Sequence, residues 1–395
     1  MHGSIATSRI SDEVRRLLGP DALERIESPL DRASGLPNAA YWSQAWFQLE
    51  QERIFQRAWV FAGADAQIPN VGDTKPLDIG GIPIMLVRGQ DRMVRAFQNV
   101  CRHRGAQIIS EPCNRKTLTC PYHAWSYGLD GRLRARPHFA GPNQHETFKQ
   151  GGGTGLDLVE VAVATFYGSI FVNVSGTAEP LSTWMHPVAE ELKDFDLSAI
   201  RWAGKLDFEV DANWKLVYEN YMENYHVFAL HPKLLKFAPM EIRGAGEWRG
   251  NTFTNGYRFP EMEEGRGAGL PHYPGLSSEN QARGVWFLTM PHFAVEVFPD
   301  QFTVLVSYPI APDKTKEELH IFLIGDEAAT GEKYRHARRS VFKMWEDLNI
   351  EDISILKSMQ QGRRCPGYDG GRLSPYWEGP TLGYARKIVE LVLAP

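Results

Sequence analysis

Two short segments bring together residue types that bind metals. The first is Cys101-Arg102-His103 and the second is Cys120-Pro121-Tyr122-His123. Each segment supplies one thiol followed by one imidazole. Thiolate and neutral imidazole are ligands for transition metals, and four of them make a closed site. Gly105 and Gly128 are turn formers, so we expect both segments on loops at strand ends.

The order of these ligands distinguishes two kinds of metal site. Structural zinc sites usually pair like with like, as two nearby Cys and two nearby His. Here each pair is mixed. One Cys and one His from each of two loops is typical of a Rieske [2Fe–2S] centre, in which two thiolates hold one iron and two imidazoles hold the other. Such a centre moves single electrons, and structural zinc is the alternative.

A second group of candidate ligands lies between Asn213 and Pro232. Glu223 and His226 are three residues apart and would share a face of a helix. His231 is five residues beyond His226, about 140° away on a regular helix. Pro232 disfavours helical geometry at His231, so the helix should end there and free that side chain. Two such histidines suit a 2-His-1-carboxylate Fe(II) site. Two ordinary core histidines are the alternative.

The carboxylate of such a site must come from another segment. Asp352 has apolar residues three, four and seven positions later, which predicts that it lies on the buried face of a helix. A buried carboxylate needs a partner, and a metal would be one. Glu351 shares a face with two serines and is expected to point toward solvent. We therefore predict Asp352 as the third ligand. The alternative is helix capping, with Asn349 as the N-cap.

Length and composition limit the class of protein. A chain of 395 residues suggests two domains, and 43% hydrophobic with 23% charged residues is typical of a globular protein. The net charge of −5 comes without a basic stripe for nucleic acid. There is no apolar run for a transmembrane helix and no apolar core of a secretory leader. Cys113 and Cys365 are left as free thiols, which fits the reducing cytoplasm.

Hydrophobic spacing predicts an order of elements along the chain. We expect an arm over residues 1–40, a first domain over 41–180 and a second domain over 181–395. The first domain should open with a helix over 41–61 and continue with short strands. In the second domain we expect helices over 213–230, 332–345, 351–361 and 382–393, strands over 293–310 and 320–325, and a long loop over 243–283.

These segments together resemble the large (alpha) subunits of Rieske non-heme iron oxygenases, the ring-hydroxylating dioxygenase family. The resemblance covers about residues 41–361. It rests on the CRHRG and CPYHAW segments and on the run from Asn213 to His231, in this order. It implies an α+β fold, with an N-terminal all-β Rieske domain and a C-terminal catalytic domain whose antiparallel sheet is flanked by helices.

The resemblance also implies roles for residues, cofactors and partners. Glu223 would bridge the two metal sites, and Asn220 would lie beside the iron ligands. Each chain would bind one [2Fe–2S] cluster and one Fe(II), with O₂ as co-substrate and electrons from NAD(P)H through a reductase or ferredoxin. A homotrimer is implied, and a small beta subunit is an option. The implied ligands are Cys101, His103, Cys120 and His123 for the cluster, and His226, His231 and Asp352 for the iron.

The substrate class is open between aromatic compounds and N-methylated or quaternary amines. Aromatic dioxygenases commonly have Asp at the bridging position, whereas Glu223 is similar to the oxygenases of carnitine and glycine betaine. The reaction would be hydroxylation, dihydroxylation or oxidative demethylation. An electron carrier without oxygenase activity and a zinc-stabilised binding protein are alternatives of another class.

Several side chains could line a substrate pocket. Aromatic rings can sandwich a substrate ring or hold a quaternary ammonium, although core packing is the alternative for each. Arg243, Arg249 and Arg258 in the expected loop could hold a substrate carboxylate, with a solvated charge as the alternative. The aromatic candidates are Tyr221, Phe228, Trp286, Phe287, Phe293, Phe298, Phe302 and Tyr308.

Overall fold

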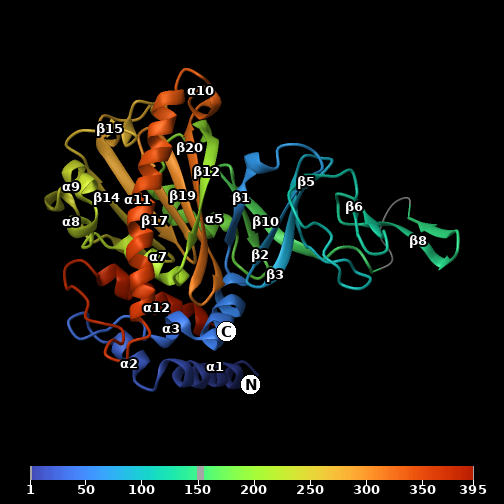
Figure 1. Cartoon of the computed structure of the whole chain (residues 1–395), viewed down its shortest axis with the longest axis horizontal. Helices are drawn as coiled ribbons and strands as arrows, with labels where there is room; N and C mark the ends of the chain where they lie inside the picture. The colour runs from blue at the N-terminus through green and yellow to red at the C-terminus, as the bar shows by residue number, and fades with distance from the viewer. Residues whose placement is uncertain (1, 149–154, 395) are drawn as a thin grey trace. The chain divides into compact units, whose positions relative to one another are not determined.

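The computed structural model describes residues 2–148 and 155–394 (Figure 1). Its contacts divide the chain into two units, Phe55–Leu181 and Met1–Ile54 together with Ser182–Pro395. The boundary between the two units after Leu181 lies within one residue of the expected boundary after residue 180. Residues 41–54 differ from expectation, because they belong to the second unit and not to the first.

A buried ion pair explains why these residues belong to the second unit. The Glu50 carboxylate lies 2.7 Å from the Lys215 ammonium, and both side chains are fully buried. The indole groups of Trp46 and Trp214 donate to the same carboxylate at 2.6 Å and 3.0 Å. Buried charges persist only when they are paired and hydrogen-bonded, so this cluster fixes the segment in place.

The helix expected over residues 41–61 is interrupted. It consists of α3 (Ala39–Trp42), α4 (Gln44–Glu50) and one π-helical turn (Gln51–Phe55), and the chain enters strand β1 at Val60. The Ser43 side chain accepts a hydrogen bond from the Trp46 amide and caps α4. The apolar residues that suggested one helix are therefore divided among two α-helices, the π-helical turn and the segment that leads into β1.

The unit Phe55–Leu181 is built from two antiparallel sheets. Their strand orders are β1-β11-β10-β4-β3-β2-β5 and β6-β7-β8-β9. Met85 and Phe97 from the larger sheet share one core with Trp125 and Tyr127, so this core holds the two sheets together. The strands are β1 (Val60–Ala64), β2 (Asp73–Ile79), β3 (Ile82–Arg88), β4 (Val94–Gln98), β5 (Cys113–Asn114), β6 (Leu118–Thr119), β7 (Ser126–Tyr127), β8 (Leu133–Gly141), β9 (Gln144–Thr147), β10 (Glu160–Phe166) and β11 (Ser169–Asn173).

The second unit contains a seven-stranded antiparallel sheet with the order β12-β20-β19-β18-β17-β14-β13. Two of its strands lie in the region 243–283, so the expectation of a long loop there was wrong. Because this region is rich in Gly and charged residues, the alternation of more buried and more exposed residues along β14 was not recognised in the sequence. The strands are β12 (Ile200–Val210), β13 (Glu247–Arg249), β14 (Thr252–Arg258), β17 (Arg283–Thr289), β18 (Phe293–Phe298), β19 (Gln301–Ala311) and β20 (Lys314–Ile324), and β15 (Glu263–Glu264) pairs with β16 (Gly267–Ala268).

Helix α11 (Arg335–Gly362) runs along the face of this sheet beside α7 (Trp214–Met222) (Figure 1). It replaces the two helices expected over 332–345 and 351–361, because no Gly or Pro interrupts residues 346–350. Among the described residues, no helix is both long and apolar enough to cross a bilayer. The other helices are α1 (His2–Leu18), α2 (Ala22–Glu27), α5 (Leu181–Trp184), α6 (His186–Glu191), α8 (Val227–Leu230), α9 (Pro232–Phe237), α10 (Asp326–Thr330) and α12 (Gly379–Leu393).

The α+β class predicted from the sequence is confirmed. Each group of candidate ligands lies within a single unit. The Cys/His segments belong to the unit of two sheets, and His226, His231 and Asp352 belong to the unit with the seven-stranded sheet and α11.

Candidate functional site

The two Cys/His loops of the first unit have the same backbone arrangement. In each loop the Cys amide donates to the carbonyl five residues later, on Ala106 and Trp125. The backbone amides of Gly105 and Ala124, each four residues after its Cys, donate to the carbonyls of Cys101 and Cys120. Both residues have a positive φ, 74° for Gly105 and 54° for Ala124. Matching loops present their side chains in matching ways, with the thiols buried and the imidazoles exposed.

The four side chains fit a two-iron cluster by their chemistry. Cys101 and Cys120 are 3% and 2% exposed, and the rings of His103 and His123 lie 4.7 Å apart at the surface of this unit. The Trp125 indole stacks on the His103 ring at 4.7 Å. The Tyr127 hydroxyl lies 3.5 Å from the Cys101 sulfur. Two thiols inside and two imidazoles outside match the thiolate-bound and imidazole-bound irons of a Rieske centre.

The second set of ligands lies where α7 ends. The expected helix over 213–230 stops at Met222, since Glu223 takes an extended conformation (φ −102°, ψ 145°). The Glu223 carboxylate then accepts hydrogen bonds from the amides of Tyr225 and, at 3.1 Å, of His226. The chain turns through α8, and Pro232 begins α9. His226 and His231 thus flank one short helix, and their rings are 5.1 Å apart.

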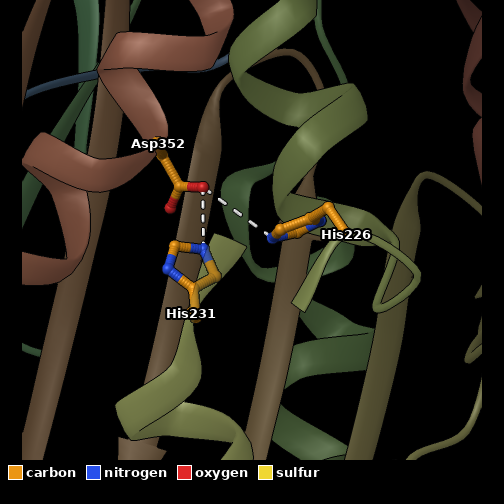
Figure 2. A group of neighbouring side chains, drawn as sticks. All are labelled: His226, His231 and Asp352. Carbon is orange, nitrogen blue, oxygen red and sulfur yellow. Dashed lines mark hydrogen bonds and ion pairs between the residues drawn. The ribbon is translucent and has the colours of Figure 1, made fainter. Parts of the chain in front are cut away.

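Asp352 on α11 completes a group of three (Figure 2). Its Oδ1 lies 3.0 Å from Nε2 of His231 and 3.7 Å from Nε2 of His226. One ligand atom from each residue can be chosen so that all three lie within 4.8 Å of one another. The Asn220 amide donates to the same oxygen of Asp352 at 3.2 Å. Two imidazoles and one carboxylate on one side of a cavity suit a non-heme Fe(II) site.

Carboxylates orient both imidazoles. Nδ1 of His226 lies 2.5 Å from Oε1 of Glu223, and Nδ1 of His231 lies 2.7 Å from Oε2 of Glu351. When each Nδ1–H donates to its carboxylate, each Nε2 keeps a free lone pair for a metal. Burial opposes the charge of His231, but the Asp352 and Glu351 carboxylates outweigh it and raise the pKa of that imidazole.

One expectation and one alternative on α11 were wrong. Glu351 was expected to point toward solvent, but its long side chain reaches back to His231 while its side chain stays 37% exposed. The capping alternative for Asp352 fails because Asn349 lies in the middle of α11 and not at its start. The Asn349 amide instead donates to the Glu317 carboxylate.

A cavity of about 110 Å³ opens beside the three residues and lies wholly within the second unit. Of the aromatic candidates, Tyr221, Trp286 and Phe298 line it. Phe228 is 54% exposed and does not, and Phe287, Phe293, Phe302 and Tyr308 lie elsewhere around the sheet. The sequence reasoning missed Tyr257, Phe259, Arg266, Glu296 and Glu317, which also line the cavity.

Strand periodicity was the signal that could have found some of them. Tyr257 lies on β14 and Phe259, two residues later, directly follows its end, and Glu296 and Phe298 are two residues apart on β18. Trp286 faces Glu296 directly across the β17–β18 pair. Residues with a period of two share one face of a sheet, so these side chains meet on the cavity side.

Comparisons with known proteins agree with both centres. A family model described as "Ring hydroxylating alpha subunit (catalytic domain)" matches residues 197–394, and a model described as "Rieske [2Fe-2S] domain" matches residues 58–150. The chain belongs to the ring-hydroxylating alpha-subunit family. It is therefore a Rieske-type oxygenase that works with a [2Fe–2S] cluster and non-heme iron. A zinc-stabilised binding protein and an electron carrier without oxygenase activity are excluded.

Relatives of this oxygenase include proteins that act on amines. A glycine betaine monooxygenase oxygenase subunit of Pseudomonas aeruginosa (strain UCBPP-PA14) is 27% identical in an alignment 390 residues long that covers 90% of this chain and 88% of that protein. A quaternary ammonium Rieske monooxygenase, solved in a study of carnitine oxidation, superposes with a TM-score of 0.78 at 22% identity over 96% of this chain and 99% of the other.

The fold alone does not select a substrate. Naphthalene 1,2-dioxygenase from Rhodococcus sp. superposes almost equally well, with a TM-score of 0.76 at 21% identity over 98% of this chain and 99% of the other. The substrate class of this oxygenase must therefore be argued from its own cavity residues.

The cavity of this oxygenase carries ionisable groups besides the metal-binding ones. Burial raises the pKa of the Glu296 carboxyl to about 8 and that of Glu317 to about 7. Both carboxyls are therefore partly or largely neutral near pH 7, because burial outweighs the Trp286 hydrogen bond and the charges of Arg266 and Arg243 that favour ionised Glu296. Of the three arginines considered as carboxylate partners, only Arg243 lines the cavity, whereas Arg249 and Arg258 are exposed.

Proposed function

We propose that this oxygenase oxidises a cationic N-methylated or quaternary amine. The observation that carries the proposal is the pairing of Trp286 with Glu296 across β17 and β18, in the cavity that contains His226, His231 and Asp352. An aromatic face next to a carboxyl group is the chemistry that holds a substituted ammonium ion. An ammonium ion beside Glu296 would favour its ionised form, whereas an aromatic hydrocarbon would leave this carboxyl neutral and without a role.

The reaction proposed is hydroxylation of a carbon bonded to the amine nitrogen. One oxygen atom of O₂ enters the C–H bond, and the other leaves as water with two electrons from the reductase and two protons. The carbinolamine then breaks its C–N bond to give a smaller amine and an aldehyde. Loss of a methyl group as formaldehyde is the demethylation form of this reaction.

Each metal group has a proposed set of ligands. Cys101, His103, Cys120 and His123 would hold the cluster, and His226, His231 and Asp352 would hold the iron. When bound, the cluster would supply single electrons and the iron would supply O₂ activation. The chain's own contribution is to hold Nδ1 of both imidazoles against a carboxylate so that Nε2 of each ring faces the metal position, to hold Asp352 through Asn220, and to place the substrate in the cavity.

Assembly and location are part of the proposal. A homotrimer would let the exposed His103 or His123 of one subunit meet Glu223 of the next, with a reductase or ferredoxin as the electron donor. None of the four cysteines forms a disulfide, which supports a reducing cytoplasm. Light scattering of the purified chain tests the trimer, and co-purification from the native host tests for a beta subunit.

A coupled O₂-uptake screen tests the substrate class. The panel contains glycine betaine, carnitine and choline against benzoate and naphthalene, with NADH and a surrogate reductase. We expect uptake with amines, accompanied by a smaller amine and an aldehyde. Uptake with the aromatic compounds alone would contradict the proposal.

A matched pair of variants ties that result to the cavity. Glu296→Gln should raise the KM for the amine about tenfold, the effect of losing roughly 1.4 kcal/mol of binding. Glu247→Gln, whose side chain is 60% exposed on β13, should leave the KM unchanged. Equal KM values in both variants would remove Glu296 from the proposed site.

A further inference from the structure

Arg243 is a buried cation on the wall of the active-site cavity. It follows the short helix after α9, and only 5% of its surface is exposed. Its Nε donates to the Ala238 carbonyl at 2.9 Å. Its Nη1 donates to the Asn224 side chain and to the Tyr257 hydroxyl, each at 2.8 Å. These three bonds hold the guanidinium in one position.

The remaining nitrogen of Arg243 has no partner. Nη2 is buried and makes no hydrogen bond. All three partners of the side chain are neutral oxygens. Within residues 2–148 and 155–394, no Asp or Glu oxygen forms an ion pair with Arg243 within 4.0 Å. A buried charge without a counter-charge is costly, and a buried donor without an acceptor adds to that cost.

The other arginines of this region do not share these properties. Arg266 also lines the cavity, but it is paired with Glu263 at 2.8 Å. Arg249 is paired with Glu191 and Glu247, and its side chain is 52% exposed. Arg243 is therefore the cavity arginine whose charge is left for a ligand to compensate.

We propose that Arg243 binds a carboxylate of the substrate, so that the substrate of this oxygenase is an amine that also bears a carboxylate. This inference rests on the proposed function for its amine half, whereas the carboxylate half stands on Arg243 alone. Arginine suits this task because its charge is permanent and its donors match a carboxylate.

A zwitterion complements both charged groups of the cavity wall. Glu296 and Arg243 both line the cavity, and among the described residues they form no ion pair with each other within 4.0 Å, so one ligand that carries both charges could compensate each of them. An ammonium beside Trp286 and Glu296 would favour the ionised carboxylate, and the ligand carboxylate would compensate Arg243. A cation without a carboxylate, such as choline, would leave Arg243 uncompensated.

The test compares ligands that differ only in the carboxylate. Glycine betaine and choline form an amine pair, and benzoate and benzyl alcohol form an aromatic pair. Binding to the wild-type holoenzyme is measured by calorimetry, and turnover by O₂ uptake. Within the pair that the enzyme uses, we expect the carboxylate member to bind at least tenfold more tightly. Equal or tighter binding of the other member would overturn the inference without any variant.

Variants then assign the effect to Arg243. Arg243→Met should remove the preference for the carboxylate member, and Arg243→Lys should keep part of it. Arg249→Met is the matched control and should behave as wild type. The cluster absorbance and circular dichroism report whether each variant folds. A preference that survives in a folded Arg243→Met would also overturn the inference.

The two proposals fail in different ways. Use of the aromatic pair alone would contradict the amine proposal, yet a preference for benzoate that depends on Arg243 would still support the carboxylate site. Use of choline in preference to glycine betaine would support the amine proposal and overturn the carboxylate site.

Discussion

Oε2 of Glu351 lies 2.7 Å from Nδ1 of His231. Glu351 directly precedes Asp352, which faces Nε2 of the same imidazole at 3.0 Å. Consecutive residues of one helix thus hold opposite sides of one ring. Glu223 has the corresponding relationship with Nδ1 of His226. Both histidines among the candidate iron ligands therefore have a carboxylate partner that sets their tautomer.

Removing Glu351 should weaken iron binding and leave the cluster intact. Without this carboxylate, His231 loses its fixed orientation, and such partners typically contribute 10- to 100-fold in metal affinity. We expect that loss in Glu351→Ala and a smaller one in Glu351→Gln, whose amide oxygen can still accept the Nδ1 proton. Iron titration of the apo-protein measures the affinity, and cluster absorbance is followed in parallel.

A control on the same helix separates this effect from helix stability. Glu346 has a side chain that is 45% exposed, and its closest basic group is Lys343 at 3.9 Å. Glu346→Ala should bind iron as wild type does. Equal affinities in Glu351→Ala and Glu346→Ala would show that Glu351 has no role at the iron.

Asp352→Ala should lose the mononuclear iron completely. Asp352 is the only described carboxylate grouped with both imidazoles, so its removal leaves a site of two neutral ligands. The [2Fe–2S] absorbance and EPR signal should persist, because the cluster ligands lie in the other unit. Metal analysis of the purified variant gives the result, and full retention of iron would instead place the ligand at Glu351 or Asp347.

The sequence predicted the ligand sets because each depends on local rules. Mixed Cys/His pairs indicated the cluster, and Pro232 predicted the end of the helix before His231. Asp352 was chosen from helical phase, and the structure groups it with both imidazoles. Glu351 was missed because phase describes where a side chain begins and not how far it reaches. Its flexible side chain turns back toward His231 from a partly exposed position.

The cavity was predicted less completely, since tertiary packing decides which aromatic residues meet. Tyr257 was missed because the glycines and charges around it suggested a loop, although β14 pairs with β17 over seven residues. Phe302 was chosen for its type, but its side chain packs on Phe322 within the sheet. Without strand register, the sequence alone could not separate the two faces of this sheet.

Glu223→Gln should retain both metal groups and lose most turnover. The amide oxygen can still accept the His226 Nδ1 proton, so iron should stay bound. The variant removes the negative charge proposed to link this site to a cluster histidine of the neighbouring subunit. Metal content and the O₂-uptake rate are measured together. Glu241→Gln, in the short 3₁₀ helix Met240–Ile242, is the control. Normal turnover in Glu223→Gln would exclude the bridging role.

Asp300 should make stability depend on pH. Its side chain is completely buried in the turn between β18 and β19, and Oδ2 has no hydrogen-bond partner. Oδ1 accepts from the Gly267 amide at 3.1 Å and from the Gln301 side chain at 3.2 Å. Burial raises the pKa of this carboxyl to about 7 from its ordinary value of 3.8.

The sign of the effect follows from proton binding. Between about pH 4 and pH 7 the folded chain keeps a proton on Asp300 that the unfolded chain has released, so raising the pH disfavours the folded state. Asp300→Asn removes this dependence. The difference in the free energy of unfolding between the variant and wild type should therefore grow in favour of the variant, by roughly 1–3 kcal/mol from pH 5 to pH 8. Urea unfolding at the two pH values measures the difference. Asp326→Asn, at a side chain that is 85% exposed, should show no such change, and a pH-independent difference for Asp300→Asn would contradict the assignment.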